Sequence, residues 1–383
     1  MIKQKKVVKI LKYIKQGQTI GIIGGGQLGQ MLALDAKANG MKVVVLDPNP
    51  ACSAGQVADA QIVAAYDDFA ALRQLAKQAD VVTYEFENVD LAALEKLGET
   101  IWLPQGTKLL KITKNRLAEK TFLKASGLDV VDFCEVNDEA QLKQAVAQIG
   151  YPCILKTAEG GYDGKSQVNI TQLADLNEAV KLLKQGQCIL EGWLDFSLEC
   201  SVMVGRNQAG QTTVFPVSEN IHRNHILHLS IVPARIDEKL QHIAKQAALK
   251  IAESLDLCGI LGVEMFIGKD GRVYINELAP RPHNSGHYSI EACDFSQFAI
   301  HNRAICGWPL PTITLLKPVV MVNVLGQHVD AMEDLIQTKP TWHFHDYGKG
   351  QALLDRKMGH VTILTEDLAQ TLAEIEATGV WKS

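Results

Sequence analysis

The sequence predicts a three-domain protein that combines α/β and α+β architecture. Its 383 residues suggest about two or three domains, because one hydrophobic core rarely serves more than about 250–300 residues. Short apolar strands alternate with helices from Thr19, and a second series of strands and helices begins near residue 104. The expected units are an N-terminal βαβ domain at 19–104, a central domain at 105–312 with a smaller unit at about 116–190, and a small β-rich C-terminal domain at 313–383.

The composition argues against several classes of protein. A net charge of −5 and a pI near 6.1 disfavour a nucleic-acid or membrane-surface binder, so we expect neither partner. No run approaches the roughly 18 consecutive apolar residues of a membrane-spanning helix. The eight cysteines lack close paired spacing, which indicates reduced thiols in a cytoplasmic protein. Residues 1–18 carry lysines and no acidic residue, and we interpret them as a basic extension that forms a loosely attached surface helix.

A glycine-rich turn follows the first strand. Gly24, Gly26 and Gly29 match G-x-G-x-x-G before a predicted helix at 30–39. Such a turn lets backbone amides approach a phosphate at a helix N-terminus, and Asp47 ends the next strand. The spacing predicts either an NAD site in an oxidoreductase or another ligand site of a mononucleotide-like βαβ domain.

Two polar residues end a later predicted strand, at 80–88. Glu85 and Asn88 fall at the carboxyl edge of the sheet, where open α/β folds bind ligands, and both can accept ribose hydroxyls. Alternatively, these side chains cap the helix predicted at 91–97. The residues alone leave both interpretations open.

A pair of glutamates on one predicted hairpin, at 262–277, is the most informative feature of the chain. If Asp270 and Gly271 form a two-residue turn, Glu264 lies directly opposite Glu277. Directly opposed residues have Cβ atoms about 4.5–5.5 Å apart, so two opposed carboxylates repel each other unless a cation lies between them. Since Mg²⁺ binds one or two carboxylates together with substrate phosphates, the pair predicts a nucleoside triphosphate site. Two solvated glutamates on an exposed sheet face are the alternative.

Further candidates lie between these segments. Lys156 ends a buried strand, and the stretch 160–166 that follows combines three glycines with Lys165. Mobile glycine amides and a lysine are suited to covering a phosphate, so the stretch is interpreted as a lid, with a plain surface turn as the alternative. Glu191 and Glu199 lie on two predicted strands and can contact adenine and ribose.

Four motifs together resemble one family of enzymes. They are GGGQLGQM at 24–31, YEFENV at 84–89, GGYDGK at 160–165 and NELAPRPHNSGH at 276–287. With Lys156, Glu191, Glu199 and the glutamate pair in this order, the chain resembles the ATP-grasp superfamily. More closely, it resembles the 5-(carboxyamino)imidazole ribonucleotide synthases of purine biosynthesis. The resemblance runs from about Thr19 to the C-terminus and is most specific at 276–287.

The resemblance implies a carbon–nitrogen ligase. Such an enzyme carboxylates 5-aminoimidazole ribonucleotide with ATP and bicarbonate, through carboxyphosphate. It also implies a pre-ATP-grasp domain, an ATP-grasp core and a C-terminal domain, with ATP and Mg²⁺ as cofactors, Mn²⁺ as a substitute for Mg²⁺, and a homodimer. In this family the glycine turn serves the substrate rather than NAD.

The residues that the resemblance implies fall into four groups. Around bicarbonate and carboxyphosphate they are Arg281, His283, Asn284, His287 and the lid residue Asp163. Around ATP they are Arg116, Lys156, Gly161, Tyr162, Asp163, Gly164, Lys165, Ser166, Gln167, Glu191, Gly192, Trp193, Leu194, Glu199, His222, Asn276 and Glu277. Around the ribonucleotide they are Gly26, Gln27, Leu28, Glu85, Asn88, Lys349, Arg356 and Lys357. The metal ligands would be Glu264 and Glu277.

Two departures from the family pattern bear on these expectations. Ser166 stands where the lid usually has glycine, and 353–355 reads Leu-Leu-Asp where related sequences have Arg-Pro-Gly. The alternatives kept open are a sister ligase that joins formate to glycinamide ribonucleotide, an NAD-binding oxidoreductase, and a nucleotide sensor without catalysis.

Overall fold

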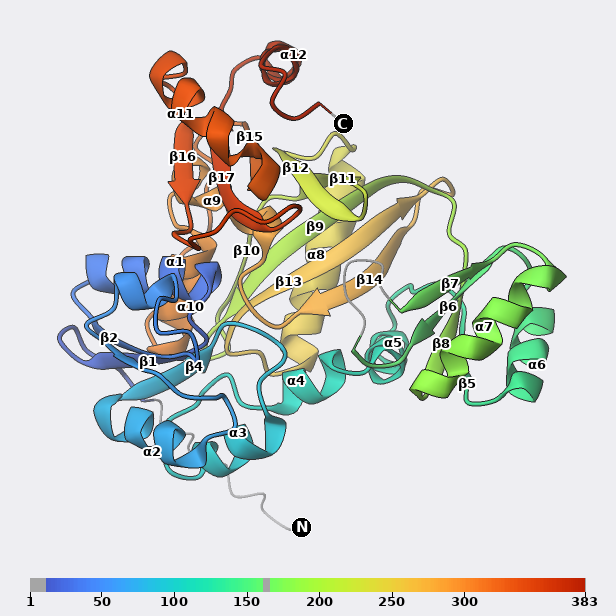
Figure 1. Ribbon diagram of the computed structural model, residues 1–383, viewed down its shortest axis with the longest axis horizontal. Coiled ribbons are helices and arrows are strands. Elements are labelled where there is room, and N and C mark those ends of the chain that lie inside the picture. The colour runs from blue at the N-terminus through green and yellow to red at the C-terminus, as the bar shows by residue number, and fades with distance from the viewer. Residues whose placement is uncertain (1–11, 161–165, 383) are drawn as a thin grey trace, which may run out of the picture.

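Three β-sheets organise the protein, and their mixture of parallel and antiparallel strands confirms the predicted α/β and α+β architecture (Figure 1). The computed structural model describes residues 12–160 and 166–382. Most of the basic extension therefore lies outside the described residues, as do Gly161, Tyr162, Asp163, Gly164 and Lys165. The described part of the extension is not helical and is firmly attached: Ile14 is fully buried and pairs through its backbone with Cys306.

The first sheet is parallel, with strand order β3-β2-β1-β4. Its strands are β1 (Thr19–Ile23), β2 (Lys42–Leu46), β3 (Ala60–Ile62) and β4 (Val81–Tyr84), and its helices are α1 (Gln27–Ala38), α2 (Phe69–Gln78) and α3 (Leu91–Gly98). Helix α3 begins after Asp90, which accepts a hydrogen bond from the Ala93 amide. The strand predicted at 80–88 stops at Tyr84. Asp90 caps α3, so the alternative that Glu85 or Asn88 caps this helix is wrong.

The central sheet has nine strands in the order β14-β13-β9-β11-β12-β15-β17-β16, with β10 beside β9. Its strands are β9 (Phe196–Arg206), β10 (Thr212–Val214), β11 (Ser218–Arg223), β12 (Ile226–Val232), β13 (Gly259–Gly268), β14 (Val273–Ala279), β15 (Val319–Leu325), β16 (His343–Asp346) and β17 (Lys357–Leu364). The helices around it are α4 (Lys108–Thr113), α5 (Arg116–Ala125), α8 (Glu238–Ser254), α9 (Ser289–Ala292) and α10 (Gln297–Ile305).

Apolar residues at Ile243, Ala247, Ile251 and Leu255 predict one face of a helix that packs behind the glutamate hairpin, and α8 lies there (Figure 1). Ala247 and Ile251 are buried in one core with Val263 and Ile275 of the hairpin. The same spacing predicts that Ile243 is buried too, which is wrong, because 39% of its surface is exposed. The buried stripe continues instead through alanines, which allow the helix to approach the sheet closely.

A separate four-stranded antiparallel sheet forms the smaller unit at the right of Figure 1. Its order is β5-β8-β6-β7, with strands β5 (Phe133–Val136), β6 (Cys153–Thr157), β7 (Gln167–Ile170) and β8 (Cys188–Gly192). Helices α6 (Glu139–Ile149) and α7 (Leu176–Leu182) pack on it. The sequence stretch predicted to be a lid lies between β6 and β7.

The C-terminal segment adds its strands to the central sheet. Strand β15 pairs with β12 in antiparallel register, and β17 and β16 follow, with α11 (Val329–Thr338) and α12 (Leu368–Ala377) beside them. Tyr347, after β16, is buried in the same core as Leu28 of the N-terminal domain. The C-terminal strands therefore connect the central sheet to the glycine-turn region.

All eight cysteines are free thiols, and seven of them are buried, as the scattered spacing predicts. Within the described ranges, no helix combines the length and the apolar character needed to cross a membrane.

Candidate active site

Glu264 on β13 and Glu277 on β14 lie directly opposite each other, which confirms the predicted pairing. The predicted two-residue turn is wrong, because Gly268 pairs with Arg272 and leaves three residues in the turn. A β-bulge at Asn276 then adds one residue to β14 and brings Glu277 back opposite Glu264. The register of the glutamates thus depends on the bulge as much as on the turn.

The two carboxylates have opposite pKa shifts. Repulsion by Glu264, and then burial, raise the pKa of Glu277 to about 7, although part of the residue remains exposed. Burial acts in the same direction on Glu264, but the hydrogen bond and charge of His283 outweigh it and lower the pKa of Glu264. Because a divalent cation between the two carboxylates would relieve their repulsion, the pair fits a Mg²⁺ site.

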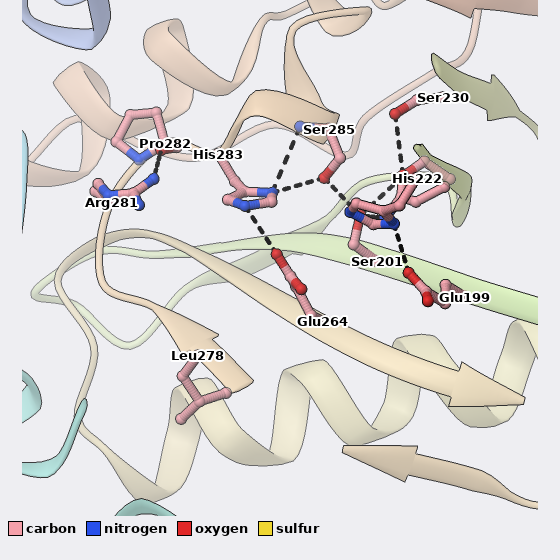
Figure 2. A network of polar contacts seen from close by, with 12 residues as sticks. Glu199, Ser201, His222, Ser230, Glu264, Leu278, Arg281, Pro282, His283 and Ser285 are labelled. Atoms are coloured by element: carbon pink, nitrogen blue, oxygen red, sulfur yellow. Dashed lines mark hydrogen bonds and ion pairs between the residues drawn. The ribbon is translucent and has the colours of Figure 1, made fainter. Parts of the chain in front are cut away.

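His283 is held in place from several sides (Figure 2). Its Nε2 lies 2.9 Å from Glu264 Oε1, and its Nδ1 lies 2.8 Å from Ser285 Oγ. Gln297 fixes the His283 backbone by accepting from its N–H at 2.9 Å and donating to its C=O at 2.8 Å. Gln297 also contacts Nδ1 of His287, which is fully buried. His287 therefore contacts Gln297 in the interior, and its predicted role at bicarbonate stays a prediction.

Arg281 lies just before His283 and pairs with Glu87, with Nη2 2.7 Å from Oε1. Burial disfavours the charged guanidinium, but the charge of Glu87 and its hydrogen bond raise the pKa of Arg281. Asn284 is buried, and its side-chain nitrogen has no hydrogen-bond partner among the described residues. An unused buried donor three residues from a guanidinium is suited to an oxyanion.

A buried cluster of charges joins the small sheet to the central sheet. Lys156 Nζ on β6 lies 2.6 Å from Glu191 Oε2 on β8, and Lys120 Nζ on α5 lies 3.6 Å from Glu191 Oε1. Burial raises the pKa of Glu191, but the charges of Lys120 and Lys156 outweigh burial and lower the pKa to about 2. Arg116, at the start of α5, donates to the Thr157 carbonyl at 3.0 Å. The Glu191 carboxylate is thus engaged by lysines, and its predicted adenine contact remains a prediction.

Glu199 on β9 and His222 on the neighbouring strand β11 lie side by side, with 2.5 Å between Oε2 and Nδ1 (Figure 2). Burial lowers the pKa of His222, but the Glu199 carboxylate outweighs it and raises the pKa. Ser201 lies on the same strand as Glu199, and its hydroxyl lies 2.6 Å from Ser285 Oγ. The charge of Glu264 also raises the pKa of His222, so the predicted ribose contact and the predicted bicarbonate shell interact electrostatically.

The other predicted nucleotide residues lie around the small sheet. Gln167 begins β7, and Gly192 ends β8 with its N–H donated to the Asp132 carbonyl at 2.8 Å. Trp193 is half exposed and Leu194 is partly buried after it. Their contacts with adenine stay predictions.

Carboxylates of the protein itself accept hydrogen bonds from the backbone amides of the predicted phosphate-binding turn. Glu85 accepts from the N–H groups of Gly26 and Gly29, both at 2.6 Å, and Asp47 accepts from that of Gly25 at 2.7 Å. Because Glu85 satisfies the first turn, α1 begins at Gln27 and not at the predicted residue 30. The amides of Gly25, Gly26 and Gly29 are therefore not free to bind a dinucleotide pyrophosphate, which disfavours the NAD interpretation.

Replacing Gly29 with alanine is expected to destabilise the fold by about 1–3 kcal/mol. The added Cβ would lie 2.6 Å from the backbone oxygen of Gly24, a contact that no side-chain rotation relieves. Urea denaturation measures the effect, and Gly98→Ala is the matched control, since its Cβ meets only Leu103, at 3.9 Å. The control is expected to stabilise α3 by up to about 1 kcal/mol. An unchanged midpoint for Gly29→Ala would contradict the close packing of this turn.

Basic residues of the C-terminal domain lie near this turn. Lys349 Nζ donates to the Lys357 carbonyl at 2.8 Å, and Arg356 donates to the Gln351 carbonyl at 3.3 Å. Gln56 of the N-terminal domain donates to the Gly348 carbonyl at 2.8 Å and ties the two domains together. The remaining predicted substrate residues differ in exposure: Gly26 and Gln27 are partly buried, Leu28 is buried in the core, and Asn88 is exposed.

The two departures from the family pattern have visible structural counterparts. Ser166 has φ 62° and Asp355 has φ 60°, the left-handed region that favours the glycine of related sequences. Asp355 accepts a hydrogen bond from the Gln327 side chain at 3.0 Å. Leu353 and Leu354 are exposed, so no apolar packing explains their replacement of arginine and proline.

Four residues at the site were not predicted from the sequence. Each is a polar or charged side chain that contacts a predicted site residue or the backbone beside it: Glu87, Glu119, Lys120 and Gln297. Glu119 and Lys120 carried the clearest signal, because charged residues seldom occupy the buried face of an amphipathic helix.

Three family models match successive segments of the chain. They describe a ribonucleotide synthetase preATP-grasp domain over 17–114, an ATP-grasp domain over 121–298 and a phosphoribosylaminoimidazole carboxylase C-terminal domain over 319–374. The N5-carboxyaminoimidazole ribonucleotide synthase of Bacillus subtilis (strain 168) is 47% identical over 368 residues, or 96% of each protein.

Solved structures agree with these matches. N5-carboxyaminoimidazole synthetase from Staphylococcus aureus, complexed with ADP, is 48% identical and has a TM-score of 0.92 over 96% of this chain and 98% of that one. The synthase from Aspergillus clavatus, in complex with ADP and 5-aminoimidazole ribonucleotide, is 31% identical and has a TM-score of 0.88 over 95% of this chain and 98% of that one.

Proposed function

The chain belongs to the N5-carboxyaminoimidazole ribonucleotide synthase family, and we propose that it carboxylates 5-aminoimidazole ribonucleotide in purine biosynthesis at the expense of ATP. It is an ATP-grasp carbon–nitrogen ligase. A bicarbonate oxygen attacks the γ-phosphorus and ADP leaves, which gives carboxyphosphate. The carboxyl group then passes to the exocyclic amine of the ribonucleotide, and phosphate leaves. Both steps require neutralised charge, aligned reactants and the exclusion of water.

The opposed pair of Glu264 and Glu277 is the observation that carries this proposal. Mg²⁺ held by these two carboxylates would neutralise charge on the phosphates of ATP, and Mn²⁺ can substitute for it. Lys156 on the small sheet and Arg116 on α5 supply positive charge, and the Coulombic influence of both on Glu277 supports their placement beside the same phosphates.

The remaining nucleotide contacts are assigned by family resemblance. Glu199 and His222 would bind ribose, and Glu191 with the Gly192, Trp193 and Leu194 segment would bind adenine. The lid, from Gly161 to Gln167, would cover the phosphates, and the resemblance assigns Asp163 within it to the reacting groups.

Arg281, His283 and Asn284 form the proposed oxyanion shell. Arg281 can grip bicarbonate with two parallel N–H donors, and the unpaired Asn284 nitrogen adds a third donor. His283 Nε2 lies 2.9 Å from Glu264 Oε1, which places the imidazole beside the proposed metal site. The ribonucleotide would lie between Glu85 and Lys349, whose charges interact.

The activity should depend on pH through Lys349. Burial, and then the neighbouring charge of Arg356, lower the pKa of Lys349 to about 8. The ammonium needed for the 5′-phosphate is therefore present below pH 8 and is lost as pH rises through 8. We expect kcat/KM for the ribonucleotide to fall about tenfold per pH unit above 8. Initial rates between pH 6.5 and 9.5 measure this fall, and Lys349→Arg should flatten the profile because arginine stays charged. A wild-type profile flat to pH 9.5 would contradict a Lys349 ammonium that is lost near pH 8.

ADP release tests the proposed function as a whole. ATP and Mg²⁺ are supplied with 5-aminoimidazole ribonucleotide, with and without bicarbonate, and separately with glycinamide ribonucleotide plus formate. Bicarbonate-dependent release only with the imidazole substrate, together with an acid-labile carbamate product, is the expected result. Release with the formate pair instead would reassign the enzyme to the sister reaction. We further propose that the protein is cytoplasmic and forms a homodimer. Sedimentation equilibrium would test the dimer.

A further inference from the structure

The β-bulge of β14 leaves part of an edge strand without a strand partner. β14 is the first strand of the central sheet, so only one of its edges pairs with another strand, β13. At the bulge, Glu264 pairs with Glu277 while Met265 pairs with Ile275, and Asn276 is the additional residue. Bulges re-aim the side chains next to them and need other partners for their backbone groups.

Two consecutive residues of α5 provide those partners. Glu119 Oε1 accepts from the Leu278 N–H at 2.7 Å. Lys120 Nζ donates to the carbonyls of Asn276 and Ile275, at 2.9 and 3.3 Å. These contacts lie immediately before and after Glu277. The helix therefore fixes the backbone on both sides of the glutamate.

Both side chains are buried, with 3% of each residue exposed. Burial of opposite charges is costly unless each is compensated by hydrogen bonds and counter-charges. Lys120 gains a further partner in Glu191 at 3.6 Å, so it also connects β14 to the small sheet. An ordinary edge strand does not require two buried side chains of opposite charge to hold its backbone, so this pair indicates a further role.

We propose that Glu119 and Lys120 are positioning residues that hold the β14 bulge so that Glu277 can bind a divalent cation together with Glu264. The inference rests on the proposed function, since it presupposes the metal site. It adds that the affinity for the metal depends on a helix that contributes no metal ligand.

The test measures Mn²⁺ binding directly, by electron paramagnetic resonance of free Mn²⁺ at saturating ADP. Glu119→Ala removes the acceptor for Leu278 N–H and should weaken Mn²⁺ binding about 10–100-fold, the usual cost of losing a group that orients a metal ligand. Glu119→Gln keeps an acceptor oxygen and should remain within about threefold of wild type. ADP affinity without metal should be unchanged in both, because neither variant alters a nucleotide contact.

Lys120→Met provides a second, independent variant, and Lys124→Met is its matched control on the exposed face of α5. Weakened Mn²⁺ binding in the first and not in the second supports the inference, even if Glu119→Ala fails to fold. Wild-type Mn²⁺ affinity in folded Glu119→Ala or Lys120→Met overturns it and leaves the proposed function intact. If the wild-type protein itself binds no Mn²⁺ with ADP, the proposed metal site falls and the inference falls with it.

Discussion

Replacing Glu277 with glutamine is expected to lower ATP turnover about 10²–10³-fold, the range found when one charge-stabilising group is removed from an active site. Glutamine keeps the size of the side chain but supplies no negative charge for a divalent cation. Stability should respond differently. Because Glu264 raises the pKa of Glu277 to about 7, the ionised carboxylate destabilises the folded state above that pH. The variant should therefore unfold no more easily than wild type at pH 8.

The control for this variant is Glu253→Gln, the same change on the exposed face of α8. It should leave turnover and unfolding temperature unchanged. Turnover by Glu277→Gln within about threefold of wild type would remove Glu277 from the metal site. A large fall in its unfolding temperature would indicate a structural role instead.

Replacing Arg281 with lysine is expected to lower kcat/KM for bicarbonate about 10²-fold or more, with ADP affinity within about threefold of wild type. Lysine retains the positive charge and can still pair with Glu87, but it cannot present two parallel donors to a planar oxyanion. ADP release at varied bicarbonate concentration gives the first quantity, and calorimetric titration with ADP gives the second.

Arg73→Lys, on the exposed surface of α2, controls for the substitution itself. An equal loss of ADP affinity in Arg281→Lys would place Arg281 in the nucleotide site. Wild-type kinetics with bicarbonate would show that charge alone suffices, and the proposed bidentate grip would be abandoned.

The glutamate pair shows how sequence reasoning succeeds and where it stops. Hairpin chemistry and strand alternation predict that Glu264 faces Glu277, and this is correct, yet the turn and the bulge deviate in compensating ways. Bulges depend on what packs against the strand, here Glu119 and Lys120, and local sequence does not encode that.

The glycine turn shows the same limit. Its G-x-G-x-x-G spacing predicts an anion at the start of α1, and an anion is there. The anion belongs to the protein, because Glu85 arrives from the end of a strand far along the chain. Periodicity predicts the helix itself, but its first residue depends on this distant carboxylate.

The pairing of β15 with β12 has a consequence for synthesis of the protein. Strands β9 to β14 leave the ribosome long before β15 to β17, so until then β12 is a bare edge that can pair with another chain. The same late strands flank the segment that carries Lys349 and Arg356. A nascent chain that stops before Val319 therefore exposes the edge of β12 and lacks the two cations proposed for the substrate phosphate. The strands that cover this edge and the segment with the proposed phosphate ligands are thus added together, at the last stage of translation.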